Sequence, residues 1–137
     1  MTQVTRRWAW RNVDAPAETV WRVLADTGWW PRWGPSVGAV EPAEGLVTTG
    51  LRGRVRTPIG LWLPFVVDDV MDGRSWRWTV AGVGATDHAV DERGPSASRV
   101  GMGVPRLARP YLAVCRVALG RIARLAEQDL GVGRAHC

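Results

Sequence analysis

The sequence predicts an α+β fold in which a curved antiparallel sheet of about six to seven strands wraps onto one long C-terminal helix. Most segments between residues 2 and 104 alternate apolar and polar side chains, as strands with one buried face do. Helix-start residues and helix breakers in the region 15–33 indicate two short helices after the first strand. Apolar residues recur at a spacing of three and four in 106–130, which predicts the only helix long enough to cover the sheet.

The first strand is expected over residues 2–13. Its alternation places Trp8 and Trp10 on one face and Ala9 between two arginines on the other. Because indole is the larger apolar group, we expect the tryptophan face to point inward.

The two short helices follow directly. Pro16 and Glu18 suit a first helical turn, because proline needs no N–H partner there and glutamate complements the helix dipole. Gly28 and Pro31 then interrupt the helical region, so that a second short turn carries Trp29, Trp30 and Trp33. Three indoles cannot all face water without forming an apolar patch. Exposure of two or more would indicate a gate to a cavity or a partner site.

The remaining strands are expected at 37–40, 48–56, 61–67, 76–80, 86–91 and 99–104, the first of them as a short edge strand. The pair Asp72–Gly73 predicts a hairpin turn because both residues tolerate positive φ. Three arginines on one face of the strand at 48–56 indicate that this side of the sheet faces water.

The long helix is expected from near Arg106 to about Leu130, where Gly131 would end it. Its buried stripe would comprise Leu107, Tyr111, Val114, Ala118, Ile122 and Leu125. The chain is therefore interpreted as one domain over residues 1–131, followed by a loose tail at 132–137.

Two stretches near the N-terminus carry a family resemblance. Residues 15–21 read Ala-Pro-Ala-Glu-Thr-Val-Trp, and residues 26–33 read Asp-Thr-Gly-Trp-Trp-Pro-Arg-Trp. Together they resemble the opening of the START/polyketide cyclase-like (SRPBCC) superfamily, including its polyketide cyclase/dehydrase and lipid-transport type. The resemblance implies a helix-grip fold with a cavity between the sheet and the long helix. It implies less about chemistry, because this superfamily includes enzymes, lipid carriers and proteins without a ligand.

Composition bears on partners and location. The net charge of +5 comes from arginine, since the chain has no lysine. Nucleic-acid binding would need aromatic residues among the arginines of the outer sheet face, and the aromatics are expected on the opposite face, so no nucleic-acid partner is expected. The chain has no run of about 18 apolar residues and no apolar leader segment, which predicts a cytoplasmic protein without stable membrane insertion. The edge strand at 37–40 would allow a homodimer.

We expect no metal site and no cofactor. Asp68, Asp69 and Asp72 gather near a hairpin but lack the ordered spacing of a calcium loop, which is typical of solvated turn acids. The glycines at 101 and 103 lie within a strand, so they do not form a phosphate-binding loop between a strand and a helix.

The expected ligand-binding residues are the inward-facing side chains together with the indoles of the second short helix and a tyrosine of the long helix. They are Trp8, Trp10, Trp30, Trp33, Leu51, Val55, Leu63, Phe65, Trp76, Trp78, His88, Met102 and Tyr111. Their indoles could frame a pocket for a flat or greasy ligand, or they could simply fill the core.

Three functions fit this pattern. The first interpretation is binding of a hydrophobic or aromatic small molecule in an internal cavity. The second is a polyketide cyclase or aromatase, in which His88 acts as acid or base and Tyr111 donates a hydrogen bond. The third is a non-enzymatic interaction partner with a filled core. His88 also fits a core histidine bonded to a neighbour, and Tyr111 a packed tyrosine, so the sequence leaves open whether the protein is an enzyme.

Overall fold

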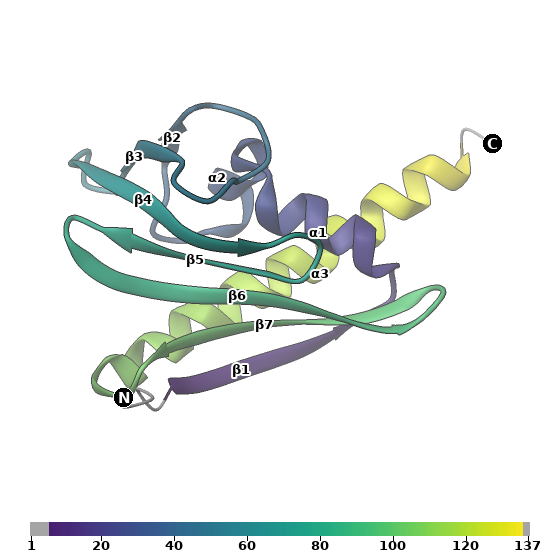
Figure 1. Ribbon diagram of the computed structural model, residues 1–137. Coiled ribbons are helices and arrows are strands. Elements are labelled where there is room, and N and C mark those ends of the chain that lie inside the picture. The colour runs from purple at the N-terminus through teal and green to yellow at the C-terminus, as the bar shows by residue number, and fades with distance from the viewer. Residues whose placement is uncertain (1–5, 136–137) are drawn as a thin grey trace.

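A computed structural model describes residues 6–135 and shows a seven-stranded antiparallel sheet curled around one long helix (Figure 1). The strand order is β1-β7-β6-β5-β4-β3-β2, so β1 and the short β2 form the two edges. The strands are β1 (Arg6–Val13), β2 (Ala39–Glu41), β3 (Arg52–Arg56), β4 (Trp62–Met71), β5 (Ser75–Val80), β6 (Val83–Gly94) and β7 (Ala97–Pro105). The predicted helix-grip fold is confirmed.

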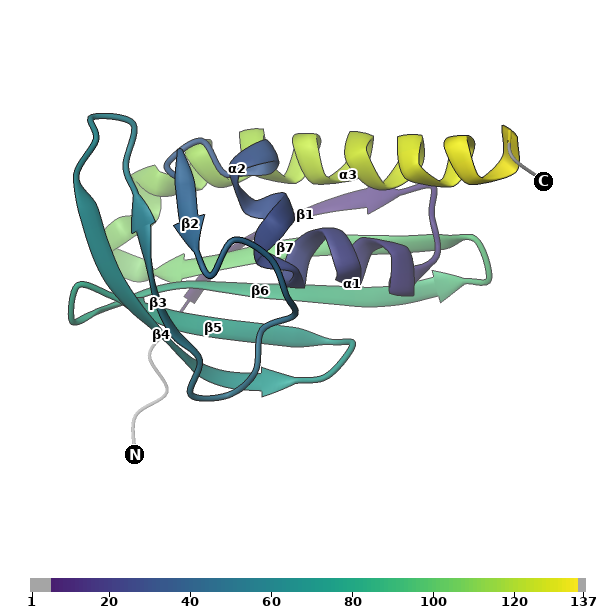
Figure 2. The ribbon, with the colours of Figure 1, turned by 90° about the horizontal axis from the view of Figure 1, so that it is seen from above.

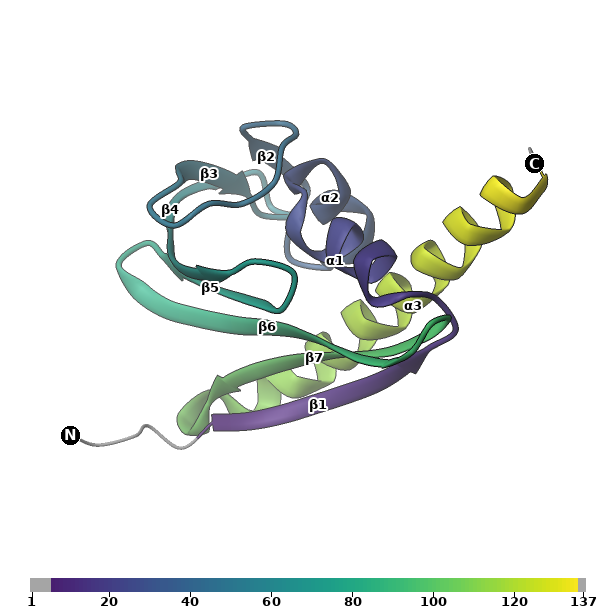
Figure 3. The ribbon, with the colours of Figure 1, turned by 45° about the vertical axis from the view of Figure 1, so that its right-hand side comes forward.

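The helices cover the concave face of this sheet. The long helix α3 (Leu112–Ala135) contacts β1 and β7, and α1 (Ala17–Ala25) packs against α3, β6 and β7 (Figure 2). The short helix α2 (Trp30–Trp33) follows the single turn η1 (Thr27–Trp29), and α2 also contacts α3. The interior is therefore enclosed by the sheet on one side and by α1, α2 and α3 on the other (Figure 3). Within the part of the chain described, no helix is long and apolar enough to cross a membrane.

The prediction that Trp8 and Trp10 face inward was wrong. Both indoles lie on the outer face of the sheet and are 38% and 39% exposed, while Ala9 and Val13 of β1 are buried on the inner face. On the neighbouring strand β7, Gly103 lies opposite Trp8 and Gly101 opposite Trp10. A Cβ at either glycine would lie within 2.7 Å of the indole beside it, so these two glycines provide the space that the indoles occupy.

The long helix begins later than predicted. Residues Arg106–Tyr111 form a 3₁₀ segment, η2, and α3 starts immediately after Pro110 and Tyr111. Proline at 110 suits the entry into a helix and not its interior. The buried stripe is consequently displaced: Leu107 is 98% exposed and Tyr111 is 38% exposed. Among the α3 side chains described, residues 112–128, the buried ones are Leu112, Cys115, Ala118, Leu119, Ile122, Ala123 and Ala126.

The helix also extends further than predicted. It continues to Ala135, past Gly131, where the sequence predicted its end. The last two residues of the predicted tail, 136 and 137, lie outside the described residues.

Candidate ligand cavity

An aromatic cluster occupies the middle of the interior. It consists of Trp30, Trp33, Phe65, Trp76 and His88. Trp76 is stacked between two rings, with centroids 4.9 Å from Trp30 and 3.7 Å from His88. All five side chains are at most 6% exposed, which makes the cluster part of the core.

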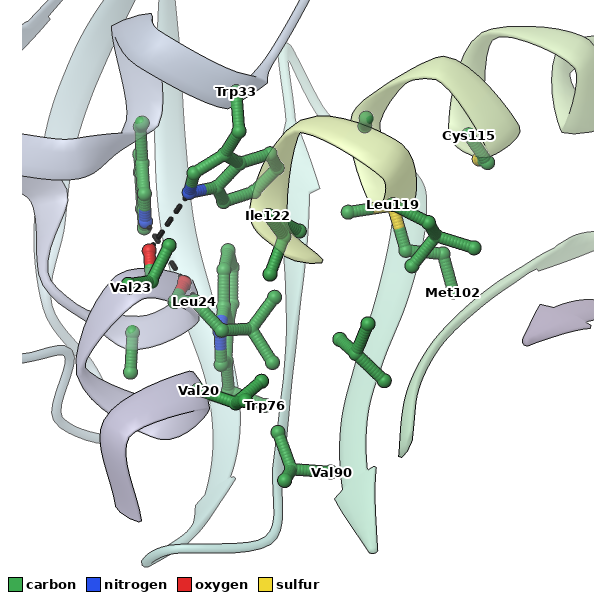
Figure 4. Close-up of a cluster of buried hydrophobic side chains, with 14 of the residues drawn as sticks. Val20, Val23, Leu24, Trp33, Trp76, Val90, Met102, Cys115, Leu119 and Ile122 are labelled. Carbon is green, nitrogen blue, oxygen red and sulfur yellow. Dashed lines mark hydrogen bonds between the residues drawn. The ribbon is translucent and has the colours of Figure 1, made fainter. Parts of the chain in front are cut away.

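The end of α1 holds this cluster in place. The last carbonyls of a helix have no partner within the helix. Here Leu24 O accepts hydrogen bonds from the Nε1 atoms of Trp30 and Trp76, at 3.1 and 3.2 Å. Val23 O accepts from Trp33 Nε1 at 2.7 Å (Figure 4). These bonds satisfy buried indole N–H groups and helix carbonyls together.

Trp30 and Trp33 are buried, which answers whether two or more of the three clustered tryptophans are exposed. Only Trp29 of the three retains partial exposure, with Arg32 lying 5.2 Å from its ring centroid. Exposure of two or more indoles, which would have indicated a gate or a partner site, is therefore not seen, and the short helix α2 instead contributes to the core.

A cavity of about 520 Å³ lies beside the aromatic cluster. Its wall consists of the inner faces of β3, β4, β5, β6 and β7, closed by η2 and by the loop before β2. Two of its lining side chains, Val83 and Leu107, are 67% and 98% exposed, so the cavity opens to solvent at this end. The lining residues are Ser36, Val37, Val55, Thr57, Leu63, Trp78, Val80, Val83, Gly84, Ala85, Thr86, Val104, Pro105, Leu107, Ala108 and Tyr111.

A second, much smaller pocket of about 40 Å³ connects the cavity to the aromatic cluster. Trp78, Thr86 and Tyr111 line both spaces. His88, Met102 and Cys115 line only the small pocket. Burial raises the pKa of the Cys115 thiol to about 11, so this group stays protonated at neutral pH.

The structure divides the thirteen predicted ligand-binding residues into four groups. Val55, Leu63, Trp78 and Tyr111 line the cavity. Trp30, Trp33, Trp76, His88 and Met102 line the small pocket but not the cavity. Leu51 and Phe65 pack in the core away from both spaces, and Trp8 and Trp10 lie on the outer face.

Several lining residues were missed by the sequence analysis. Val80, Thr86 and Val104 share the inward parity of Trp78, His88 and Met102, so alternation along each strand could have identified them. The loop residues Ser36 and Val37, and the η2 residues Leu107 and Ala108, carry no such signal.

His88 is held by two hydrogen bonds. Its Nδ1 lies 3.2 Å from Trp76 O, and its Nε2 lies 2.9 Å from Thr86 Oγ1. Burial lowers the pKa of His88 to about 3, so the ring is neutral at physiological pH. Tyr111, the second residue of the cyclase interpretation, forms a 2.9 Å hydrogen bond with Ser36 and not with His88.

The outer face of the sheet differs from the expectation in one respect. Aromatics do lie among its arginines: Arg99 is 4.0 Å from the Trp10 ring centroid, and Arg54 is 4.4 Å from that of Trp62. Both of these arginines also contact carboxylates, Arg99 that of Asp91 at 2.8 Å and Arg54 that of Glu41 at 2.7 Å. The absence of a nucleic-acid partner remains a prediction. The reason given for it, that the aromatic residues lie on the face opposite the arginines, does not hold.

Comparison with known proteins places this geometry in a family. The sequence profile named polyketide cyclase/dehydrase and lipid transport matches residues 1–127. The chain belongs to this family. The START/polyketide cyclase-like resemblance of residues 15–33 is thereby confirmed. No curated protein matches the sequence of this family member.

Solved structures share its fold at low sequence identity. The aromatase/cyclase Zhui from Streptomyces sp. R1128 is 15% identical, with a TM-score of 0.69 over 92% of this chain and 95% of that protein. The protein XoxI from Bacillus cereus is 14% identical, with a TM-score of 0.70 over 92% and 97%. A START superfamily protein from Mycobacterium smegmatis is 15% identical, with a TM-score of 0.65 over 88% and 98%. At these identities the likeness shows the fold of the family and not a shared substrate.

Proposed function

We propose that this family member binds a hydrophobic or aromatic small molecule in its cavity. The observation that carries the proposal is an apolar space of about 520 Å³ that opens to solvent. Pockets for small ligands have volumes of roughly 300 to 1,000 Å³ and walls that are mostly apolar with a few polar groups. Here the side chains with hydrogen-bonding groups in the lining are Ser36, Thr57, Trp78, Thr86 and Tyr111.

The proposed ligand would lie between the sheet, the η2 segment and the loop before β2, in the open half of the interior. Val55, Leu63, Val80 and Val104 would contact its apolar surface, and Trp78 would offer an aromatic wall. Family membership supports this proposal, because the family description includes lipid transport.

A cyclase reaction through His88 has less support. General acid or base catalysis needs a group that can exchange a proton with the substrate near neutral pH. Both ring nitrogens of His88 already have partners within the protein, and its pKa lies far below 7. The hydroxyl groups of Ser36, Thr57, Thr86 and Tyr111 line the cavity, so a reaction in this site would have to use them.

A partner protein with a filled core has less support as well. The aromatic cluster is filled, but the cavity beside it is not. Binding of a small molecule would account for the cavity. A purely structural role gives no reason for it.

Titration with the neutral apolar fluorophore N-phenyl-1-naphthylamine tests the proposal. We expect saturable one-to-one binding to the wild type and loss of binding in Val80→Trp, because the new indole would occupy the cavity. Trp10→Ala, on the outer face, is the matched control and should bind like the wild type. Absence of saturable binding to the wild type, or equal binding to Val80→Trp, would contradict the proposal.

A further inference from the structure

A chain of hydrogen bonds links the aromatic cluster to the wall of the cavity. Trp78 Nε1 lies 3.0 Å from Thr86 Oγ1, Thr86 Oγ1 lies 2.9 Å from His88 Nε2, and His88 Nδ1 lies 3.2 Å from the carbonyl oxygen of Trp76. Thr86 lines both the cavity and the small pocket, so the middle of this chain borders the proposed ligand.

The two ends of the chain determine where each proton lies. A backbone carbonyl can only accept, so His88 Nδ1 must carry a proton and donate it to Trp76 O. His88 is buried among aromatic rings and neutral, so its Nε2 has no proton and accepts from Thr86. At the other end an indole nitrogen can only donate, so Trp78 Nε1 donates to Thr86 Oγ1.

With these assignments, the Thr86 hydroxyl can form only one kind of hydrogen bond with a ligand in the cavity. Its one hydroxyl proton is used by His88, and one of its two lone pairs is used by Trp78. The remaining lone pair can only accept a hydrogen bond. An ordinary threonine hydroxyl rotates to donate or accept, whereas this one is fixed as an acceptor by its neighbours.

We infer that the cavity selects a flat apolar ligand with a hydroxyl or N–H group, such as a phenol, that donates a hydrogen bond to Thr86 Oγ1. This inference rests on the proposed function and names its ligand class. A ligand that offers only an acceptor at this position, such as an ether or a ketone, would place two lone pairs against each other and would be disfavoured.

Two other hydroxyl sites of the cavity lack this restriction. Thr57 Oγ1 accepts a 3.2 Å hydrogen bond from the backbone N–H of Leu61 and keeps its own proton to donate. Ser36 and Tyr111 share one hydrogen bond, which leaves one of their two hydroxyl protons available. Discrimination in favour of a donor ligand should therefore depend on Thr86 and not on Thr57.

Three matched probes test the inference: 2-naphthol can donate and accept, 2-methoxynaphthalene can only accept, and naphthalene can do neither. Isothermal titration calorimetry would give the affinity of each. We expect the wild type to bind 2-naphthol about fivefold more tightly than 2-methoxynaphthalene, the size of one ordinary hydrogen bond. Thr86→Ser should keep this preference, Thr86→Val should abolish it with little change for naphthalene, and Thr57→Val should keep it.

The outcomes separate the inference from the function on which it rests. Equal binding of 2-naphthol and 2-methoxynaphthalene to the wild type, or a preference that persists in Thr86→Val, would overturn the role of Thr86 and leave the cavity as a ligand site. Failure of all three probes to bind would overturn the proposed function itself. The wild-type comparison needs no variant, so it holds even if Thr86→Val folds poorly.

Discussion

The aromatic cluster and the cavity lie next to each other on the same face of the same sheet, yet one is packed and the other is empty. Over the cluster, α1 and α2 add to the cover that α3 provides, and the carbonyls at the end of α1 fix three indoles. Over the cavity, only η2 and the loop before β2 close the space, and Gly84, Ala85 and Ala108 leave room. The three indoles of the filled half are therefore the ones that a helix end anchors. Four experiments test this difference and separate it from the outer face of the sheet.

The largest expected effect is on stability in the packed half. Trp76→Ala should lower the free energy of unfolding by about 3–5 kcal/mol, because it removes a buried indole between two rings and leaves a cavity. Trp78→Ala should cost less, about 1–3 kcal/mol, because Trp78 is half-buried and already borders an empty space. Urea denaturation of both variants measures the two values. Equal losses would contradict the distinction between a packed and an empty half.

Substitutions that enlarge a side chain should also distinguish the packed half from the empty half. Val67→Trp, at a position that is 0% exposed, should destabilise the fold by about 1–3 kcal/mol or more, because the packed half has no space for an indole. Val80→Trp should cost under about 1 kcal/mol, because its indole can extend into the cavity. Thermal unfolding of the two variants provides the comparison. Similar destabilisation of both would indicate that the cavity is closed in solution.

His88 should give the packed half a pH dependence of its own. Burial lowers its pKa in the folded state from 6.5 to about 3, so between these values the unfolded chain binds a proton that the folded chain does not. Stability from this group is complete above pH 6.5 and falls as the pH falls toward 3. Between pH 6.5 and 5 we expect a loss of roughly 1–2 kcal/mol.

Urea denaturation at these two pH values, repeated with His88→Gln, isolates the contribution of this histidine. Other titrating groups act in both proteins and cancel in the difference. The variant should lose about 1–2 kcal/mol less than the wild type over this interval. Identical pH dependence in the two proteins would mean that His88 is not buried in its neutral form.

The smallest expected effect concerns the outer face. Trp10→Ala removes an exposed indole that stacks on Trp8, with ring centroids 5.3 Å apart, and lies under Arg99. Such exposed contacts contribute about 1 kcal/mol or less. Chemical denaturation should show this small loss, and affinity for an apolar probe should not change. A clear loss of probe binding would mean that the outer face takes part in ligand binding.

The sequence could predict the fold and much of the inner face, because strand alternation needs only the residues of one strand. It placed Val55, Trp76, His88 and Met102 correctly on the inner face. It failed for Trp8 and Trp10, since alternation divides a strand into two faces without saying which is buried. That choice depends on Gly101 and Gly103 of another strand, about ninety residues away along the chain.

The position of the cavity could not be predicted in the same way. Trp76 and Trp78 have the same parity on β5, but the first is enclosed in the core and the second borders empty space. Which of them is enclosed depends on where α1 ends and on the 3₁₀ segment that displaces the start of α3. These are properties of tertiary packing and not of any local pattern.

Methyl NMR with N-phenyl-1-naphthylamine tests the central claim, that the empty half is the ligand site, most directly. Addition of this probe should shift the methyl signals of the cavity residues Val55, Leu63, Val80 and Val104. The methyl signals of Val20, Val23 and Leu24, which pack in the filled half, should stay in place (Figure 4). Saturable shifts confined to the cavity residues are the result we expect. Shifts centred on the α1 residues, or no saturable shift at any methyl group, would contradict the account.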